Sequence, residues 1–190
     1  MTLLILGIVV FLGMHLLPTV PGVREKLAAR LGENGYKALF ALLSIAGFVL
    51  LVYGFAKAPV IQVWTPPSWT RWVAIVLMWP AFVFLVAAYV PGEIKAKLKH
   101  PFLVAIKTWA LAHLIANGDL ASIILFGSFL AYAVYDRITL MARRPTALIE
   151  APGPGSRRND VIAVALGTAL YLAFLLWLHP LLIGRPVLPH

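Results

Sequence analysis

The chain has 190 residues, of which 62% are hydrophobic and only 12% are charged. Soluble domains carry about 25% charged residues, so the composition excludes an ordinary soluble protein. The formal charge of +9 does not indicate a nucleic-acid partner, because the basic residues sit in separate connections between apolar runs and form no continuous face. The chain has no cysteine, which excludes disulfides, thiolate metal sites, covalently attached haem and a cysteine nucleophile.

Six apolar runs predict six transmembrane helices. A helix rises about 1.5 Å per residue and the hydrocarbon core is about 30 Å thick, so such runs can span a bilayer, whereas barrel strands would be about half as long. The first run lacks a signal-peptide cleavage motif and is expected to stay in place. The expected helices cover residues 2–17, 38–56, 72–90, 101–117, 120–135 and 161–178. The sequence thus predicts an all-α polytopic bundle embedded in lipid, with a single transmembrane domain over residues 1–190.

The distribution of lysine and arginine predicts the orientation, because basic residues stay on the cytoplasmic side. Twelve of the sixteen lie in the connections after the first, third and fifth helices, three lie on the opposite side, and Lys107 lies inside a helix. Both termini are therefore expected outside the cytoplasm. The connection 136–160 is rich in proline, glycine and arginine and is expected to be a cytoplasmic linker. Trp64, Trp69 and Trp72 are expected to form an aromatic belt at the opposite interface.

Histidines at the expected spans are the main candidates for a functional site, because polar side chains are costly inside a bilayer. They are His15, His100, His113 and His179. His100 and His113 are separated along one helix by about 19.5 Å, so they cannot bind the same iron. By depth, His15 would pair with His100 near the inner face and His113 with His179 near the outer face. The alternative is that each histidine only forms an interhelical hydrogen bond.

Haem b is the cofactor that these histidines favour. Zinc is usually held by four Cys, His or carboxylate ligands, and the expected spans contain neither cysteine nor carboxylate. A neutral imidazole is an ordinary axial ligand of haem, and an apolar helical bundle with aromatic walls suits the porphyrin. Whether one or two haems are held stays open at this point.

Other polar residues accompany His113. Lys107 is expected in mid-span, where it would pair with a carbonyl, contact a haem propionate or place a charge in a substrate cavity. Asn117, Gly118 and Asp119 follow His113 at a helix corner. Gly118 and Asp119 suit helix caps, and Asp119 could also orient a histidine ring. Lys107, Asn117 and Asp119 are thus further candidates for cofactor binding.

Several short motifs resemble those of the NnrU family of bacterial membrane proteins. The most specific is the block 107–119, Lys-Thr-Trp-Ala-Leu-Ala-His-Leu-Ile-Ala-Asn-Gly-Asp, and the others include Phe11-Leu12-Gly13-Met14-His15, Lys99-His100-Pro101, Tyr135-Asp136-Arg137 and His179-Pro180. The resemblance implies a multi-pass protein of the bacterial cytoplasmic membrane. It also implies a link to nitric-oxide and nitrite metabolism in denitrification, with no assigned reaction.

The chain also resembles the plant and cyanobacterial 15-cis-ζ-carotene isomerases, membrane proteins that use haem b to isomerise a carotenoid double bond. A histidine in the first helix, a His-Pro pair and a later Ala-His match His15, His100 and His113 here. This resemblance implies His113 and His15 as axial ligands and a hydrophobic carotenoid or isoprenoid substrate. Ala110 stands where the isomerases carry a cysteine that takes part in ligand switching, so that switch is not expected.

A third resemblance implies a different activity. Lys99-His100-Pro101, with Arg137 further on, is similar to a motif of the isoprenylcysteine carboxyl methyltransferase superfamily, whose members bind S-adenosylmethionine. It implies that His100 and Arg137 contact that cofactor from the cytoplasmic side. The acidic pair of those enzymes is missing. A non-enzymatic accessory protein, with histidines that only join helices, is the remaining alternative.

Overall fold

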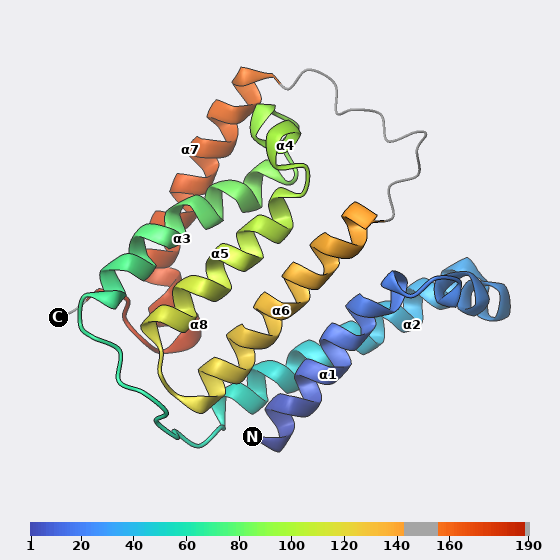
Figure 1. The fold of residues 1–190 in the computed structure, drawn as a ribbon, viewed down its shortest axis with the longest axis horizontal. Helices are drawn as coiled ribbons and strands as arrows, with labels where there is room; N and C mark the ends of the chain where they lie inside the picture. Colours follow the sequence, from blue (N-terminus) through green and yellow to red (C-terminus); the bar gives the residue numbers. More distant parts are fainter. Residues whose placement is uncertain (143–155, 189–190) are drawn as a thin grey trace. The chain divides into compact units, whose positions relative to one another are not determined.

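The computed structural model describes residues 1–142 and 156–188, in which the regular elements are helices (Figure 1). They are α1 (Thr2–Leu16), η1 (Leu17–Thr19), α2 (Val23–Ala56), α3 (Thr70–Ala87), α4 (Glu93–Leu98), α5 (Pro101–Ala116), α6 (Leu120–Ala142), α7 (Arg157–Ala173), the π-helical segment η2 (Phe174–Leu178) and α8 (His179–Ile183). The prediction of an all-α fold is confirmed.

Among the described residues, five helical segments are long and apolar enough to cross a membrane. They are Thr2–Thr19, Val23–Ala56, Thr70–Ala87, Leu120–Ala142 and Arg157–Ile183. The remaining expected span is present as α5, whose 16 residues extend about 24 Å, less than a hydrocarbon core of about 30 Å. Large apolar side chains such as Val9, Leu42 and Val76 are exposed along these helices, as suits contact with lipid. The chain is a multi-pass membrane protein.

The expected boundary of the second helix is wrong. Helix α2 begins at Val23 and not at residue 38, so the basic residues of the first connection lie on a helix. Its first part ends in a kink at Gly32, which has a φ of 72°. Arg24 pairs with Glu33 across that kink at 2.7 Å. A search for apolar runs does not find the first part of α2, because many of the residues that favour a helix there are charged or alanine.

The expected linker 136–160 is also too long. Helix α6 continues to Ala142, and α7 begins at Arg157. Residues 136–142 extend α6 because they include Ile, Leu, Met and Ala, which favour or tolerate a helix. Residues 143–155 of the expected linker lie outside the described residues.

The chain divides into two compact units. Unit 1 comprises residues 1–65 and 117–139, and unit 2 comprises 66–116 and the described residues from 140 onward. In unit 1, α1 and α2 run antiparallel side by side (Figure 1). Three glycines let the two backbones approach: Gly7 faces Leu51, Gly47 faces Phe11 and Gly54 faces Leu4. Small residues at such contacts are typical of helices that pack within membranes.

In unit 2, α3 packs against both α5 and α7. The Trp79 indole Nε1 donates to the Thr168 hydroxyl at 2.9 Å, and the Tyr171 hydroxyl donates to the Ile75 carbonyl at 3.1 Å. Gly167 lies against the backbone of Val83. These contacts hold α7 antiparallel to α3, so the C-terminal end of α7 and the segment after it approach the end where α3 begins.

Asp160, in the first turn of α7, holds the start of α4. Its two carboxylate oxygens accept the backbone N–H groups of Glu93 and Ile94 at 3.1 and 3.0 Å. Nearby, the Asn159 amide donates to the Pro91 carbonyl at 2.7 Å. A carboxylate suits this place, because the first N–H groups of a helix lack intrahelical partners and carry partial positive charge.

We expect Asp160→Ala to lower the free energy of unfolding by about 1–3 kcal/mol, because it removes a charged acceptor from two N–H groups. Thermal unfolding in detergent measures the change. Asp160→Asn keeps one acceptor oxygen and should lose less than the alanine variant. Equal melting temperatures for the wild type and Asp160→Ala would show that this contact does not stabilise the fold.

Candidate functional site

His113 lies one turn from the end of α5 and is half-buried. Its ring Nδ1 is 2.9 Å from the Trp109 carbonyl, one turn earlier on the same helix. The Trp109 ring packs against the imidazole with a centroid distance of 5.5 Å. Because a carbonyl only accepts, this contact favours a proton on Nδ1 of the His113 ring.

His179 follows a break in regular α-helix. The preceding segment, η2, is π-helical, and Pro180 explains the break, because proline has no N–H for the Leu176 carbonyl. The His179 Nδ1 is 2.8 Å from the Arg185 carbonyl, so it has the same preferred tautomer as His113. His113 and His179 both belong to unit 2.

His15 lies in unit 1, at the end of α1, in aromatic surroundings. Its Nδ1 is 2.7 Å from the Phe11 carbonyl. Its ring lies 4.3 Å from Phe11, 5.5 Å from Phe40 and 6.4 Å from Tyr132, measured between centroids. Three helices of unit 1 thus enclose this imidazole with rings.

The other candidates lie at separate places. His100 stands at the start of α5, at the opposite end of that helix from His113, as its spacing predicts. Lys107 lies between them, six residues before His113, which places it on a helix face rotated by about 120°. Arg137 lies on α6 of unit 1, whereas His100 belongs to unit 2. One Arg137 nitrogen, Nη1, is buried without a hydrogen-bond partner among the described residues.

The corner after α5 shows a structural role for Asp119. Its Oδ1 accepts the Ser122 backbone N–H at 2.9 Å and its Oδ2 accepts the Ser122 hydroxyl at 2.7 Å, which makes it the N-cap of α6. Gly118 does not have the left-handed conformation of a common C-cap. Its carbonyl accepts the Val63 N–H at 2.9 Å, and a Cβ atom at Gly118 would collide with the Trp64 carbonyl oxygen. Glycine is thus required here for a close approach of two backbones.

We expect Asp119→Ala to cost about 0.5–2 kcal/mol of stability, the usual price of losing an N-cap. Asp119→Asn keeps an acceptor oxygen for the Ser122 N–H and should unfold close to the wild type. Thermal unfolding compares the two variants. If Asp119→Asn is as unstable as Asp119→Ala, the carboxylate charge matters and capping alone does not explain the residue.

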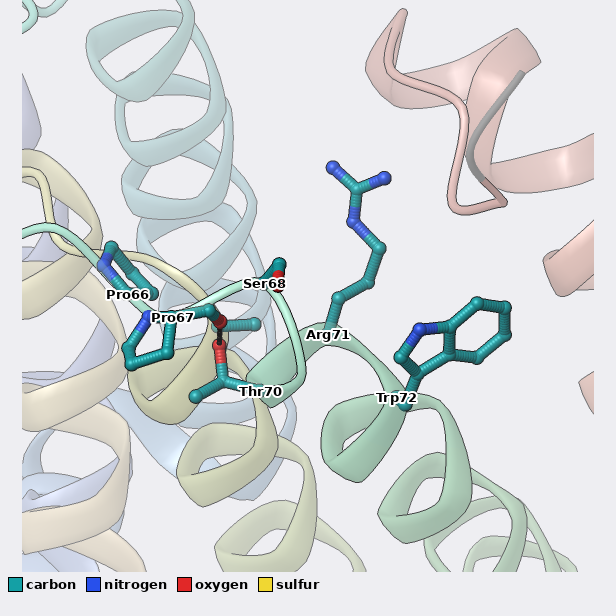
Figure 2. Close-up of a pocket in the computed structure, with 7 residues that line it drawn as sticks. Pro66, Pro67, Ser68, Thr70, Arg71 and Trp72 are labelled. Atoms are coloured by element: carbon teal, nitrogen blue, oxygen red, sulfur yellow. Dashed lines mark hydrogen bonds between the residues drawn. The ribbon is translucent and has the colours of Figure 1, made fainter.

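A hollow of about 320 Å³ lies where α3 begins and α5 ends, and we name it the Arg71 hollow (Figure 2). It is lined by Pro66, Pro67, Ser68, Thr70, Arg71, Trp72 and Ala116. The sequence predicts an aromatic belt for the tryptophans here and does not indicate a hollow. The only signal in the sequence is Arg71, a cation close to Trp69 and Trp72 at the start of an apolar helix.

A family model described as NnrU protein matches residues 3–187, nearly the whole chain. The chain belongs to the NnrU family. No curated protein and no solved structure matched it in the same comparisons. Membership confirms the resemblance found in the sequence and agrees with the multi-pass architecture. It assigns no cofactor, substrate or site residue to this NnrU-family protein.

The donor groups of this NnrU-family protein suit haem better than a metal held only by side chains. In residues 1–142 and 156–188, no three His, Cys, Asp or Glu side chains come together as a metal-ligand group. A haem iron needs only one or two axial ligands, because the porphyrin supplies the others. In both His113 and His179 a backbone carbonyl lies within hydrogen-bond distance of Nδ1, which is the kind of second interaction that histidine ligands of iron have.

Proposed function

We propose that this NnrU-family protein binds haem b in the bacterial cytoplasmic membrane, with His113 as one axial ligand and His179 as the other. The observation that supports the proposal is that unit 2 contains two imidazoles, each with its Nδ1 within hydrogen-bond distance of a backbone carbonyl. Such a second interaction fixes the tautomer and ring orientation of a histidine that ligates a metal. When bound, haem supplies a one-electron redox centre.

The same proposal assigns the protein a redox-linked role on a hydrophobic substrate. The isomerase resemblance favours a cis–trans isomerisation of a carotenoid or isoprenoid, and the family context favours nitric-oxide metabolism in denitrification. Within the protein, the Trp109 carbonyl orients His113 and the Trp109 ring covers one side of it. The Arg185 carbonyl orients His179.

The visible absorption spectrum of the protein purified in mild detergent from haem-sufficient cells tests the proposal. We expect a Soret band and, after reduction with dithionite, sharpened α and β bands of a low-spin haem b. A pyridine haemochrome assay then gives the number of haems per chain, for which the proposal predicts one. Colourless protein that cannot be loaded with haem would contradict it.

If the protein is colourless, the two alternative functions that the sequence indicates should be tested next. A membrane methyltransferase would bind S-adenosylmethionine, and binding would be lost in His100→Ala. An accessory protein would bind neither cofactor and would co-purify with a stable partner. Isothermal titration with S-adenosylmethionine separates these two outcomes.

A further inference from the structure

The first part of α2, residues 23–31, forms a short helix just past the end of the first membrane-crossing segment. That crossing segment ends at Thr19, and α2 begins at Val23. The kink at Gly32, with a φ of 72° and a ψ of 159°, separates residues 23–31 from the rest of α2. Residues 23–31, which we name the basic segment, therefore start close to the boundary between lipid and water.

The basic segment has an apolar stripe along one face. Val23, Leu27 and Leu31 are spaced by four residues, so they lie on the same side of the helix. Leu31 is 47% exposed, and Val20, in the turn before the segment, is 50% exposed. At both ends of the segment, apolar side chains are thus left uncovered by the protein that the structure describes. An apolar face at this place suits contact with lipid.

Charged residues are placed around this stripe by the helical rotation of about 100° per residue. Lys26 and Arg30 lie along one border of the stripe, and Arg24 lies along the other. Glu25 is on the opposite side, about 160° from the centre of the stripe. Long basic side chains beside an apolar face can reach phosphate groups while that face enters the lipid. The segment thus has the charge pattern of a helix that lies in a membrane surface.

Arg24 holds the segment in place, whereas Lys26 and Arg30 are left for an outside partner. The Arg24 guanidinium donates to Glu33, beyond the kink, at 2.7 Å and lies 5.7 Å from the centre of the buried Tyr36 ring. Lys26 and Arg30 are exposed and take part in none of the ion pairs found in residues 1–142 and 156–188. The two positive charges on this border of the stripe can therefore bind an external anionic group.

We propose that the basic segment lies in the membrane surface and binds anionic phospholipids. Leu27 and Leu31 enter the edge of the acyl region. Lys26 and Arg30 bind the lipid phosphates. An acidic protein would match these charges, but it would not explain an apolar stripe next to the end of a membrane-crossing segment. The distribution of basic residues predicts this segment on the cytoplasmic side, where anionic lipids attract such segments.

The chain has no cysteine, so a single introduced cysteine can carry a spin label that reports the depth of the segment. Leu31→Cys and Glu25→Cys are labelled and reconstituted in vesicles of phosphatidylcholine and phosphatidylglycerol. We expect the label at position 31 to collide with oxygen dissolved in lipid and the label at position 25 to collide with a water-soluble nickel complex. Equal access of the nickel complex to both labels would overturn the placement in the membrane surface.

The preference for anionic lipid is tested with a polarity-sensitive fluorophore on Leu31→Cys. Phosphatidylglycerol is titrated into the protein in mixed micelles of detergent and phosphatidylcholine, and the half-saturating concentration is measured. Lys26→Gln combined with Arg30→Gln should raise that concentration about 10- to 30-fold, because each basic residue near an anionic surface contributes about fivefold.

Lys57→Gln, at the other end of α2, is the matched control and should leave the half-saturating concentration unchanged. Gel filtration shows that each variant is still folded. A double variant that responds like the parent protein would overturn the role of Lys26 and Arg30. A fluorophore that responds equally to further phosphatidylcholine would overturn the preference for anionic lipid.

Discussion

Replacing His113 by alanine is expected to lower the bound haem about 10- to 100-fold, because losing even a group that orients a metal ligand has an effect of that size. The pyridine haemochrome assay on purified variant protein measures the loss. Circular dichroism and gel filtration should show that the variant is still inserted and helical. A full haem complement in His113→Ala would remove His113 from the ligand set.

Three further histidine variants complete this experiment. His179→Ala should retain haem but lose the low-spin spectrum, because one axial position becomes vacant. His15→Ala, in unit 1, should keep the low-spin spectrum. His100→Ala is the matched control on the same helix as His113, at its other end, and should resemble the wild type. If His15→Ala instead loses the low-spin spectrum, the second ligand is His15, as the isomerase resemblance implies, and our assignment of His179 is wrong.

Replacing Gly7 by alanine is expected to lower the free energy of unfolding by about 1–3 kcal/mol, the usual effect of overpacking a closely packed contact. A Cβ atom at Gly7 would collide with the backbone of Leu51, so α1 and α2 would have to move apart. The midpoint of thermal unfolding in detergent, followed by the loss of the monodisperse gel-filtration peak, measures the effect.

Gly13 provides the matched control, because it lies on the same helix and a Cβ atom there meets nothing within 4 Å. Gly13→Ala should be neutral or stabilising by up to about 1 kcal/mol, since alanine favours a helix more than glycine does. The two identical substitutions should thus shift the midpoint in opposite directions, or by clearly different amounts. Equal shifts would show that the close approach of α1 and α2 is not what Gly7 provides.

The sequence predicted those features that depend on short stretches of chain. Apolar runs located the membrane-crossing helices, because the length of a run is compared directly with the thickness of a bilayer. Asp119 was recognised as a helix cap because the Ser122 groups that it binds lie only three residues away. The separation of His100 from His113 followed from the helical rise alone.

The predicted helix ends were wrong where a helix continues through charged residues beyond its apolar run. The start of α2 at Val23 does not follow from hydropathy, because Arg24, Lys26 and Arg30 lie outside the apolar run. The end of α6 does not follow from it either, because its last turns carry Asp136 and Arg137. In both places, helix propensity continues a helix past the end of its apolar run.

The sequence by itself determined the class of this protein, its membrane-crossing segments, its family and its candidate histidines. Only the tertiary structure decided which residues are neighbours: Ala116 and Arg71 line one hollow, and Gly7 lies against Leu51. The physical reason is the distance along the chain over which each effect acts. Hydropathy, capping and helical rise depend on residues that are close in sequence. Contacts between distant segments depend on how the helices pack, and that packing involves side chains from several helices at once.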